Sequence, residues 1–233
     1  MASKWLVDAE TEKAMWADIR ADSVKAASRA NPGLILDLGG SVGSFTRLIT
    51  SGVPGLRAVS IDIVKPETVP ECEFVLGDAL RLPFKDGAFS AVGARAVLHH
   101  FPDSLDDSMA ELDRVLAPGG VLVVEEPCAG NPLAAVARRL FPTDRHDPDE
   151  KPLTAGQMVG AMSGRFSVSE TKPYFVFSYL APHIVSRVPG WKKPLARRIA
   201  AALYGLDQAL VPRCGLARRA AAYVHISAAK GKK

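Results

Sequence analysis

The chain has 233 residues, of which 48% are apolar and 23% charged, and its formal net charge is +4. This length and apolar content favour one domain with a sizeable core. No stretch approaches the ~20 consecutive apolar residues of a membrane span, and charged residues interrupt the N-terminal segment, so we expect neither a transmembrane helix nor a secretory signal. The three cysteines, Cys72, Cys128 and Cys214, are scattered and odd in number, which indicates a reduced, cytoplasmic setting without a disulfide framework or a metal site.

A helix and a short buried strand are predicted at the start of the chain. Residues 8–28 indicate a helix with Trp16 and Ile19 on its apolar side, which either caps a sheet or folds over a ligand cleft. Residues 34–36 form an apolar run bounded by Pro32-Gly33 and by later glycines, which is typical of a buried parallel strand.

An acidic residue and a glycine-rich turn follow this strand, before a helix predicted over residues 44–50. Residues 37–43 are Asp-Leu-Gly-Gly-Ser-Val-Gly, and doubly wound sheets hold cofactors at such turns. A dinucleotide fingerprint has no acid two residues before its first glycine, and a carboxylate at Asp37 repels a diphosphate. The same carboxylate suits S-adenosylmethionine, which carries an ammonium and a sulfonium and no phosphate. An ordinary strand-to-helix turn is the alternative.

Two further acids stand where the next two strands end. Residues 56–61 alternate in polarity and precede Asp62, and residues 74–76 precede Asp78. A carboxylate at Asp62 could accept both ribose hydroxyls, and one at Asp78 could accept an adenine amine. Each acid alone is typical of a helix N-cap or a turn. Their order at three consecutive strand ends favours an adenosyl ligand.

The later pattern continues to alternate helices and strands. The expected elements are a turn at 85–87, a strand at 89–94, an amphipathic helix at 102–117, a strand at 121–124, strand segments at 166–170 and 174–177, and a last strand at 221–228. We interpret the first five strands as β/α steps, which predict a parallel sheet with right-handed crossovers. The fold class is therefore α/β: a doubly wound, mostly parallel, seven-stranded sheet with helices on both faces and a C-terminal helical insertion before the last strand.

The chain resembles the class I S-adenosylmethionine-dependent methyltransferases, in the type 11 subgroup that includes the ubiquinone and menaquinone methyltransferases. The segments that carry the resemblance are 35–43, 60–63, 76–89, 97–101 and 111–127. The family usually has glycine where Ser41 stands. The resemblance implies a Rossmann-like fold whose last strand runs antiparallel beside its predecessor. It also implies one domain, 1–233, with an N-terminal helix in 1–30, a cofactor-binding core in 31–130, and a substrate-side lid, a basic helix and the last strands in 131–233.

The resemblance assigns expected roles to individual residues. It places the amino-acid end of S-adenosylmethionine among residues of the glycine-rich turn, the ribose near the end of the second strand, and adenine near the end of the third. The backbone near Arg95 would close the pocket. The expected cofactor-binding residues are Asp37, Gly39, Gly40, Ser41, Gly43, Asp62, Ile63, Asp78, Ala79 and Arg95.

Positive charge is concentrated at the C-terminal end. Residues 180–233 contain eleven Lys and Arg against the single acid Asp207, a net of +10 that leaves the rest of the chain at −6. An apolar stripe at helical spacing crosses this segment and comprises Trp191, Leu195, Ile199, Leu203, Leu206 and Leu210. A basic amphipathic helix is typical of peripheral membrane contact or of a cover over an anionic, greasy substrate. The alternative is a lid helix that packs its stripe on the domain. We expect no nucleic-acid partner, because aromatic residues are few.

Methyl transfer would proceed by in-line attack of a substrate O, N or C nucleophile, so the protein contributes mainly positioning. Candidate bases are His99 and His100, which follow the fourth strand, and His146 in a polar segment at 141–150 that predicts either a mobile loop over the site or a solvated linker. If residues 99 and 100 are extended, only one of these side chains faces the cleft. The acceptor is expected to be a lipid, an isoprenoid or an anionic metabolite. The alternatives are a cofactor-binding regulatory or scaffold protein without turnover and an NAD-dependent oxidoreductase.

Overall fold

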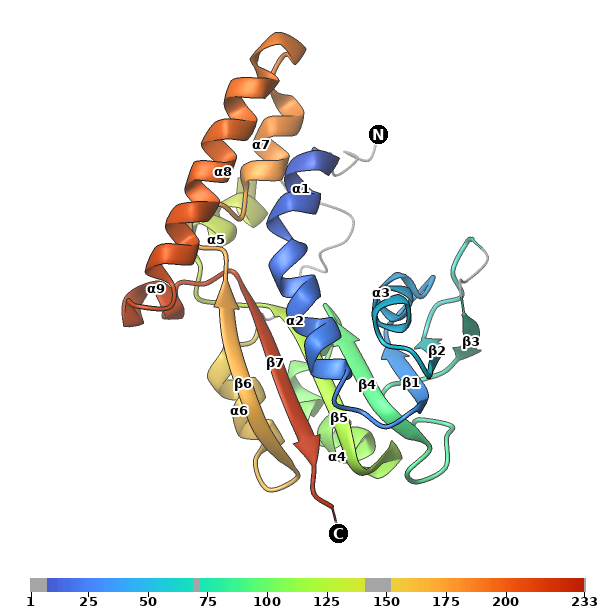
Figure 1. Ribbon diagram of the computed structural model, residues 1–233. Helices are drawn as coiled ribbons and strands as arrows, with labels where there is room; N and C mark the ends of the chain where they lie inside the picture. The colour runs from blue at the N-terminus through green and yellow to red at the C-terminus, as the bar shows by residue number, and fades with distance from the viewer. Residues whose placement is uncertain (1–7, 69–71, 141–151, 233) are drawn as a thin grey trace.

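One seven-stranded sheet organises the protein, whose computed structural model describes residues 8–68, 72–140 and 152–232 (Figure 1). The strand order is β3-β2-β1-β4-β5-β7-β6. The strands are β1 (Gly33–Leu38), β2 (Leu56–Asp62), β3 (Glu73–Leu76), β4 (Phe89–Arg95), β5 (Leu116–Pro127), β6 (Phe166–Tyr174) and β7 (Tyr223–Lys230). Strands β1 to β5 are parallel, and β7 is antiparallel to its neighbours β5 and β6. The predicted fold class and the antiparallel last strand are confirmed.

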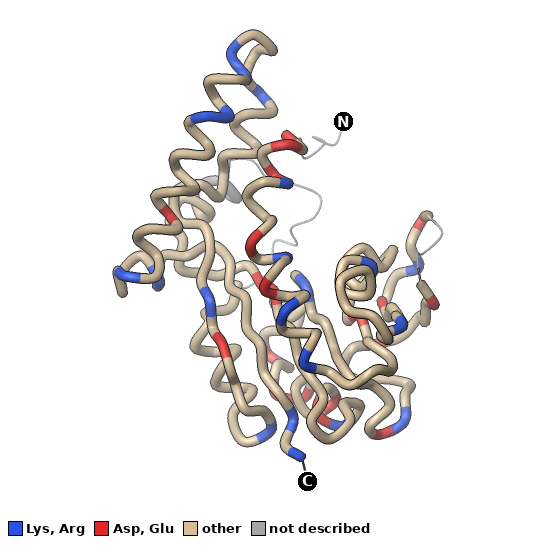
Figure 2. The backbone as a smooth tube through the Cα atoms, in the orientation of Figure 1, with Lys and Arg blue, Asp and Glu red and all other residues tan. Residues whose placement is uncertain are grey.

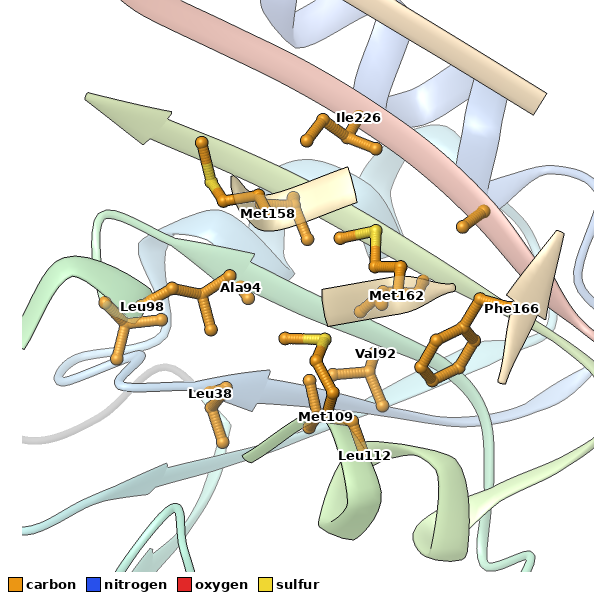
Figure 3. Packing of buried hydrophobic residues seen from close by; sticks show 14 of the residues in the cluster. Leu38, Val92, Ala94, Leu98, Met109, Leu112, Met158, Met162, Phe166 and Ile226 are labelled. Carbon is orange, nitrogen blue, oxygen red and sulfur yellow. The ribbon is translucent and has the colours of Figure 1, made fainter. Parts of the chain in front are cut away.

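Helices cover both faces of the sheet. On one face, α2 (Ala17–Ala27) and α3 (Ser44–Gly52) pack Ala27, Phe45 and Ile49 against the strands. On the other face lie α4 (Leu105–Val115) and α6 (Ala155–Met162), whose Met109 and Met162 meet the sheet (Figure 3). A fully buried side chain of this size contributes about 1.5–3 kcal/mol, so these two apolar layers hold the sheet between the helices. The remaining helices are α1 (Ala9–Met15), α5 (Pro132–Leu140), α7 (Ala181–Arg187), α8 (Lys193–Leu210) and α9 (Gly215–Arg219).

The N-terminal helix predicted over 8–28 is divided into α1 and α2 at Trp16. The ring of Trp16 packs on Phe175 and Tyr223, with ring centroids 5.1 and 4.8 Å apart. This packing anchors the junction of the two helices beside the sheet. Figure 1 shows α1 continuing beyond the sheet towards α7 and α8, whereas α2 lies along the strands.

The helix predicted over 102–117 is shorter, because Leu116 leaves it to begin β5. Leu116 is extended, fully buried and paired with Phe89 of β4. A short 3₁₀ turn, Pro102–Ser104, precedes α4. The strand segment predicted at 166–170 lies in β6, which continues to Tyr174. The segment predicted at 174–177 is wrong beyond its first residue, because Phe175 takes a left-handed backbone conformation and ends the strand.

The interpretation of five β/α steps is wrong in detail. In the described residues, no helix connects β2 to β3 or β3 to β4. Arg114 of α4 instead fastens the connection before β4, donating to the carbonyls of Phe84 at 2.7 Å and Leu82 at 2.9 Å. Glu111 accepts from the backbone N–H of Leu82 at 2.8 Å. Side chains of α4 therefore provide hydrogen-bond partners for backbone groups of the connection between β3 and β4. A helix in that connection would have paired such groups with one another.

The C-terminal insertion is a helical hairpin of α7 and α8, joined by a 3₁₀ turn at Gly190–Lys192 and followed by α9. Figure 1 shows it rising beyond the end of the sheet at which β1 and β4 finish. Its inner side contacts α1, where Arg197 pairs with Asp8 at 2.9 Å and also contacts Glu10. Ala200 and Asp207 are buried on this side of α8.

The predicted apolar stripe of α8 is not packed on the domain. Trp191 is 79% exposed, Leu195 63% and Ile199 54%, and Leu206 and Leu210 are also exposed. The interpretation of a lid helix with a packed stripe is therefore wrong. The helix buries a neighbouring face of smaller and polar residues instead. Figure 2 shows basic residues on α7, α8 and α9, where Asp207 is the only acid of the described residues 180–232.

Candidate functional site

The glycine-rich turn after β1 closes tightly against two other parts of the sheet edge. Gly39 has a φ of +65°, and a Cβ there would lie 2.5 Å from a methyl of Val97, so a side chain does not fit. Its N–H donates to the carbonyl of Ile61 at 2.9 Å, which ties the turn to β2. Gly40 lies against the carboxyl group of Asp37, and Gly43 forms the left-handed N-cap of α3.

Asp37 is buried at the centre of this turn, with 1% of its surface exposed. One oxygen, Oδ2, accepts from the N–H of Thr46 at 3.2 Å and from its hydroxyl at 3.1 Å. The other, Oδ1, has no hydrogen-bond partner among the described residues. Burial raises the pKa of Asp37 to about 6, while the bonds from Thr46 and the charge of Arg95 act in the opposite direction. Oδ1 of Asp37 is thus a buried hydrogen-bond acceptor to which no donor or cation is bonded in the described residues.

Asp62 is tied to the glycine-rich turn. It accepts from the N–H of Ser41 at 3.1 Å through Oδ2 and from that of Val64 at 3.1 Å through Oδ1. Ser41 adopts a left-handed conformation, with a φ of +46°, at the position where the family usually has glycine. Ser41 therefore adopts a backbone conformation that glycine favours, and the hydrogen bond from its N–H to the Asp62 carboxylate stabilises that conformation.

A cavity of about 410 Å³ joins the ends of several strands. Six of the predicted site residues line it: Gly39, Asp62, Ile63, Asp78, Ala79 and His100. Ala96, Val97 and Phe101 complete much of the wall and were not predicted. Asp78 also accepts from the N–H of Leu80 at 2.9 Å, so it serves the local turn as well. Asp37, Gly40, Ser41, Gly43 and Arg95 are not among the residues that line this cavity.

Arg95 ends β4 between aromatic and acidic groups. Its guanidinium carbon lies 5.7 Å from the ring centre of Trp16 and 5.9 Å from that of Phe45. Its Nε is 3.5 Å from Oε2 of Glu125. Burial raises the pKa of Glu125, although the positive charge of Arg95 acts in the opposite direction. The side chain of Arg95 therefore links the start of α2 and α3 to β5, a role beyond the backbone role expected for it.

The two histidines after β4 lie in a 3₁₀ turn, Leu98–His100, and are not extended. Their rings stack with centroids 4.2 Å apart. His99 is buried with Nδ1 2.8 Å from Glu126, which also accepts from the N–H of Val97 at 2.6 Å. His100 lines the cavity, whereas His99 does not. His146 lies outside the described residues, as does the whole of the predicted loop at 141–150.

Glu125 and Glu126 were missed by sequence reasoning. Both are fully buried at the end of β5, and Glu125 accepts from Ser23, whose hydroxyl is also 3.2 Å from Nδ1 of His225. The sequence signal for them is a pair of acids at the end of an apolar strand. Carboxylates buried at such a position need hydrogen-bond or charge partners, which indicates a polar site. Among the described residues, no group of three or more His, Cys, Asp and Glu side chains is placed to hold a metal, and no helix is long and apolar enough to cross a membrane.

Residues 36–124 match the family model described as a methyltransferase domain. Over this part of its length the chain is similar to methyltransferases. It is 37% identical over 117 residues to a demethylmenaquinone methyltransferase of Thermus thermophilus, covering 46% of this chain and 53% of that protein. It is 36% identical over 107 residues to a sterol 24-C-methyltransferase of Gibberella zeae, covering 41% of this chain and 28% of that protein. The chain thus spans about half the length, or less, of these methyltransferases.

Solved structures share the fold of this chain. Geranyl diphosphate C-methyltransferase from Streptomyces coelicolor, solved with S-adenosyl-L-homocysteine, has a TM-score of 0.57 and 14% identity, with 93% of this chain and 79% of that chain covered. The [4+2]-cyclase SpnF has a TM-score of 0.62 and 19% identity, with 93% of this chain and 81% of that chain covered. These likenesses establish the fold, while a cyclase among them means that the fold does not by itself define the reaction.

Proposed function

We propose that this protein transfers a methyl group from S-adenosylmethionine to an O, N or C nucleophile of a small-molecule acceptor. The observation that carries the proposal is Oδ1 of Asp37, a buried acceptor without a partner beside the glycine-rich turn. The ammonium of the cofactor's amino-acid end matches the charge and the donor that this oxygen lacks. Asp62 and Asp78, at the ends of the next two strands, line the cavity that would receive the adenosine.

The charge of the residues present suits S-adenosylmethionine, since the unpaired oxygen of Asp37 is a partner for its ammonium. Gly39, Gly40, Ser41 and Gly43 would surround its amino-acid end, with Arg95 closing that side. Asp62 and Ile63 would bind the ribose, and Asp78 and Ala79 would flank the adenine. When bound, the cofactor supplies an activated methyl group on a sulfonium. The chain's own contribution is to hold the two reactants in line and to exclude water from them.

A base is needed when the acceptor arrives protonated. Of the three candidates, we favour His100, because it lines the cavity. His99 is directed to Glu126 instead, and this pair fixes the turn that carries both histidines. His99 therefore acts as a positioning residue in this proposal.

We place the acceptor among apolar or anionic small molecules, such as lipids and isoprenoids. The protein similar in sequence that acts on demethylmenaquinone and the fold neighbour bound to geranyl diphosphate support this class. The basic C-terminal region supports a second part of the proposal, which is that the protein contacts membrane surfaces peripherally.

Two other functions are less well supported. An NAD-dependent oxidoreductase needs the N-terminus of α3 for a pyrophosphate, but Asp37 already accepts the N–H of Thr46 in the first turn of that helix. A cofactor-binding scaffold without turnover would keep the same pocket. The fold it shares with a cyclase means that the fold alone does not require methyl transfer.

Transfer of a labelled methyl group from S-adenosylmethionine distinguishes these functions. The protein is incubated with a lipid extract and, separately, with a soluble metabolite extract. We expect label in the lipid fraction, and much less with His100→Ala, whereas Asp106→Asn on the exposed side of α4 retains activity. Binding of S-adenosylhomocysteine without transfer to either extract would indicate a scaffold. Binding of NADH in place of S-adenosylhomocysteine would overturn the proposal.

A further inference from the structure

The exposed side of the helical hairpin combines apolar and basic residues in one surface. The docking face, as we call it, consists of Trp191, Leu195, Ile199, Leu206 and Leu210 with the flanking Lys192 and Arg198. Ile184 of α7 and Leu216 of α9 are also exposed, at 59% and 77%. Apolar residues at this density on a helix surface indicate an interaction site.

The charge of this region is unbalanced at the surface. Asp207 is the only acid among the described residues 180–232, and it is buried on the inner side of α8. Asp8 and Glu10 reach α8 from α1, but both pair with Arg197 on the inner side. The outer side thus presents Lys192 and Arg198 without a carboxylate from its own segment, and Figure 2 shows basic residues along the hairpin and α9.

This charge distribution determines which occupant fits. A second copy of the chain would bring two positively charged faces together, which like-charge repulsion opposes. A nucleic acid would match the charge, but the exposed leucines and isoleucine offer no stacking surface. A bilayer with anionic lipids matches both properties, because acyl chains receive apolar side chains and headgroups receive cations.

The tip of the hairpin has the composition of a membrane anchor. Trp191 is 79% exposed in the 3₁₀ turn, and the Nζ of Lys192 lies 4.6 Å from its ring centre. A tryptophan beside a lysine suits the boundary between headgroups and acyl chains, where the ring enters the apolar side and the ammonium remains at the phosphates. Leu195 and Ile199 continue the apolar side one and two turns further along α8.

We infer that the docking face binds the surface of bilayers that contain anionic lipids, with Trp191, Leu195 and Ile199 inserted at the headgroup boundary. The inference deepens the proposed function and rests on it for its purpose, since it names the partner of the protein's basic region. The hairpin rises at the end of the sheet where β1 and β4 finish, which is also the end that carries the cofactor cavity (Figure 1). Docking there would bring this end of the protein towards lipid-borne acceptors.

Vesicle flotation of the full chain tests this inference without any turnover. Vesicles of phosphatidylcholine alone are compared with vesicles that also contain phosphatidylglycerol, at low and high salt. We expect binding to the anionic vesicles, weakened by salt. The variant Trp191→Ser/Leu195→Ser/Ile199→Ser should bind about tenfold more weakly or worse, because three inserted apolar side chains are lost. The control Leu76→Ser/Leu133→Ser/Val136→Ser removes exposed apolar residues elsewhere and should bind like the unchanged protein.

The fluorescence of Trp191 provides a second readout. The difference between the emission of the unchanged protein and that of Trp191→Phe should shift to the blue when anionic vesicles are added. No binding, equal loss in the control variant, or binding without this shift would overturn the inference. Self-association through the stripe or salt-sensitive binding to RNA, in the absence of vesicle binding, would overturn it in favour of that partner. Binding of S-adenosylhomocysteine to the same variants is measured separately, so failure of the docking face and failure of the proposed function are distinguishable.

Discussion

Thr46 donates both its backbone N–H and its hydroxyl to the same oxygen of Asp37, at 3.2 and 3.1 Å. The other oxygen of this buried carboxylate has no hydrogen-bond partner in the described part of the chain. Helix α3 thus fixes the orientation of Asp37 and leaves one acceptor available. An unpaired acceptor at this depth costs free energy unless a ligand satisfies it, which makes Asp37 the most informative residue of the site.

Asp37→Asn should weaken binding of S-adenosylhomocysteine by about 30-fold or more, which corresponds to about 2 kcal/mol for the loss of one partner of a buried charged hydrogen bond. An amide can still accept from Thr46, but it does not carry the charge that attracts the ligand's ammonium. Isothermal titration calorimetry measures the change. Asp106→Asn on the exposed side of α4 is the matched control and should bind normally. Equal affinities for the unchanged protein and Asp37→Asn would remove Asp37 from the binding site.

The affinity for S-adenosylhomocysteine should also depend on pH. Burial raises the pKa of Asp37 to about 6, so without ligand this carboxyl group takes up a proton as the pH falls through that value. An ammonium favours the carboxylate form. Affinity should therefore rise as the pH increases from about 5 to about 7 and level off above, by up to tenfold per pH unit on the rising part. Asp37→Asn should lose this rise. A rise that persists in Asp37→Asn would assign the titration to another group, such as Glu125, whose pKa is also raised by burial.

Ser41→Gly should stabilise the fold by about 0.5–1 kcal/mol, because a serine with a φ of +46° is strained and glycine is not. The gain is smaller than the full strain, because glycine loses more conformational freedom on folding. The midpoint of urea unfolding measures it. Ser44→Gly, in the first turn of α3, tests whether the effect is specific and should lower stability instead. Loss of stability in Ser41→Gly would mean that the serine side chain itself holds the turn.

The positions of Asp37, Asp62 and Asp78 were predictable, because each acid follows an apolar run short enough to be a strand. Parallel strands bring their carboxyl ends to one edge, so order along the chain becomes proximity in space. The contact between His99 and Glu126 was not predictable in this way. It joins residues 27 positions apart on different elements, and only the burial of Glu126 requires it.

The exposed stripe of α8 shows the limit of periodicity. A period of 3.6 residues identifies which side chains share a face, but it does not reveal which face is covered. The covered face of α8 includes Ala200, which permits close packing, and Asp207, which bonds to backbone groups. The short side chain and the buried acceptor decide the orientation of the helix, and the larger apolar residues remain outside.

Asp207→Ala should destabilise the protein by about 3–5 kcal/mol, because this buried carboxylate organises the segment between β6 and α7. It accepts from the N–H groups of Val176, Phe177 and Ser178, each at 3.0 Å, and from the hydroxyl of Ser178 at 2.6 Å. Alanine would leave these donors without their acceptor, whereas Asp207→Asn keeps one acceptor oxygen and should lose less. Urea unfolding measures the difference.

The matched control for this change is Arg198→Ala, which removes an exposed charge from the same helix and should alter stability by less than about 0.5 kcal/mol. Hydrogen exchange adds a local readout, because the amides of 176–178 should lose protection in Asp207→Ala before the amides of β1 and β4 do. If Asp207→Ala were as stable as Arg198→Ala, then Asp207 would not attach α8 to the sheet. The orientation of the hairpin would then depend on its other attachments, which include the pair between Asp8 and Arg197 and the hydrogen bond from Tyr204 to Asp18 at 2.6 Å.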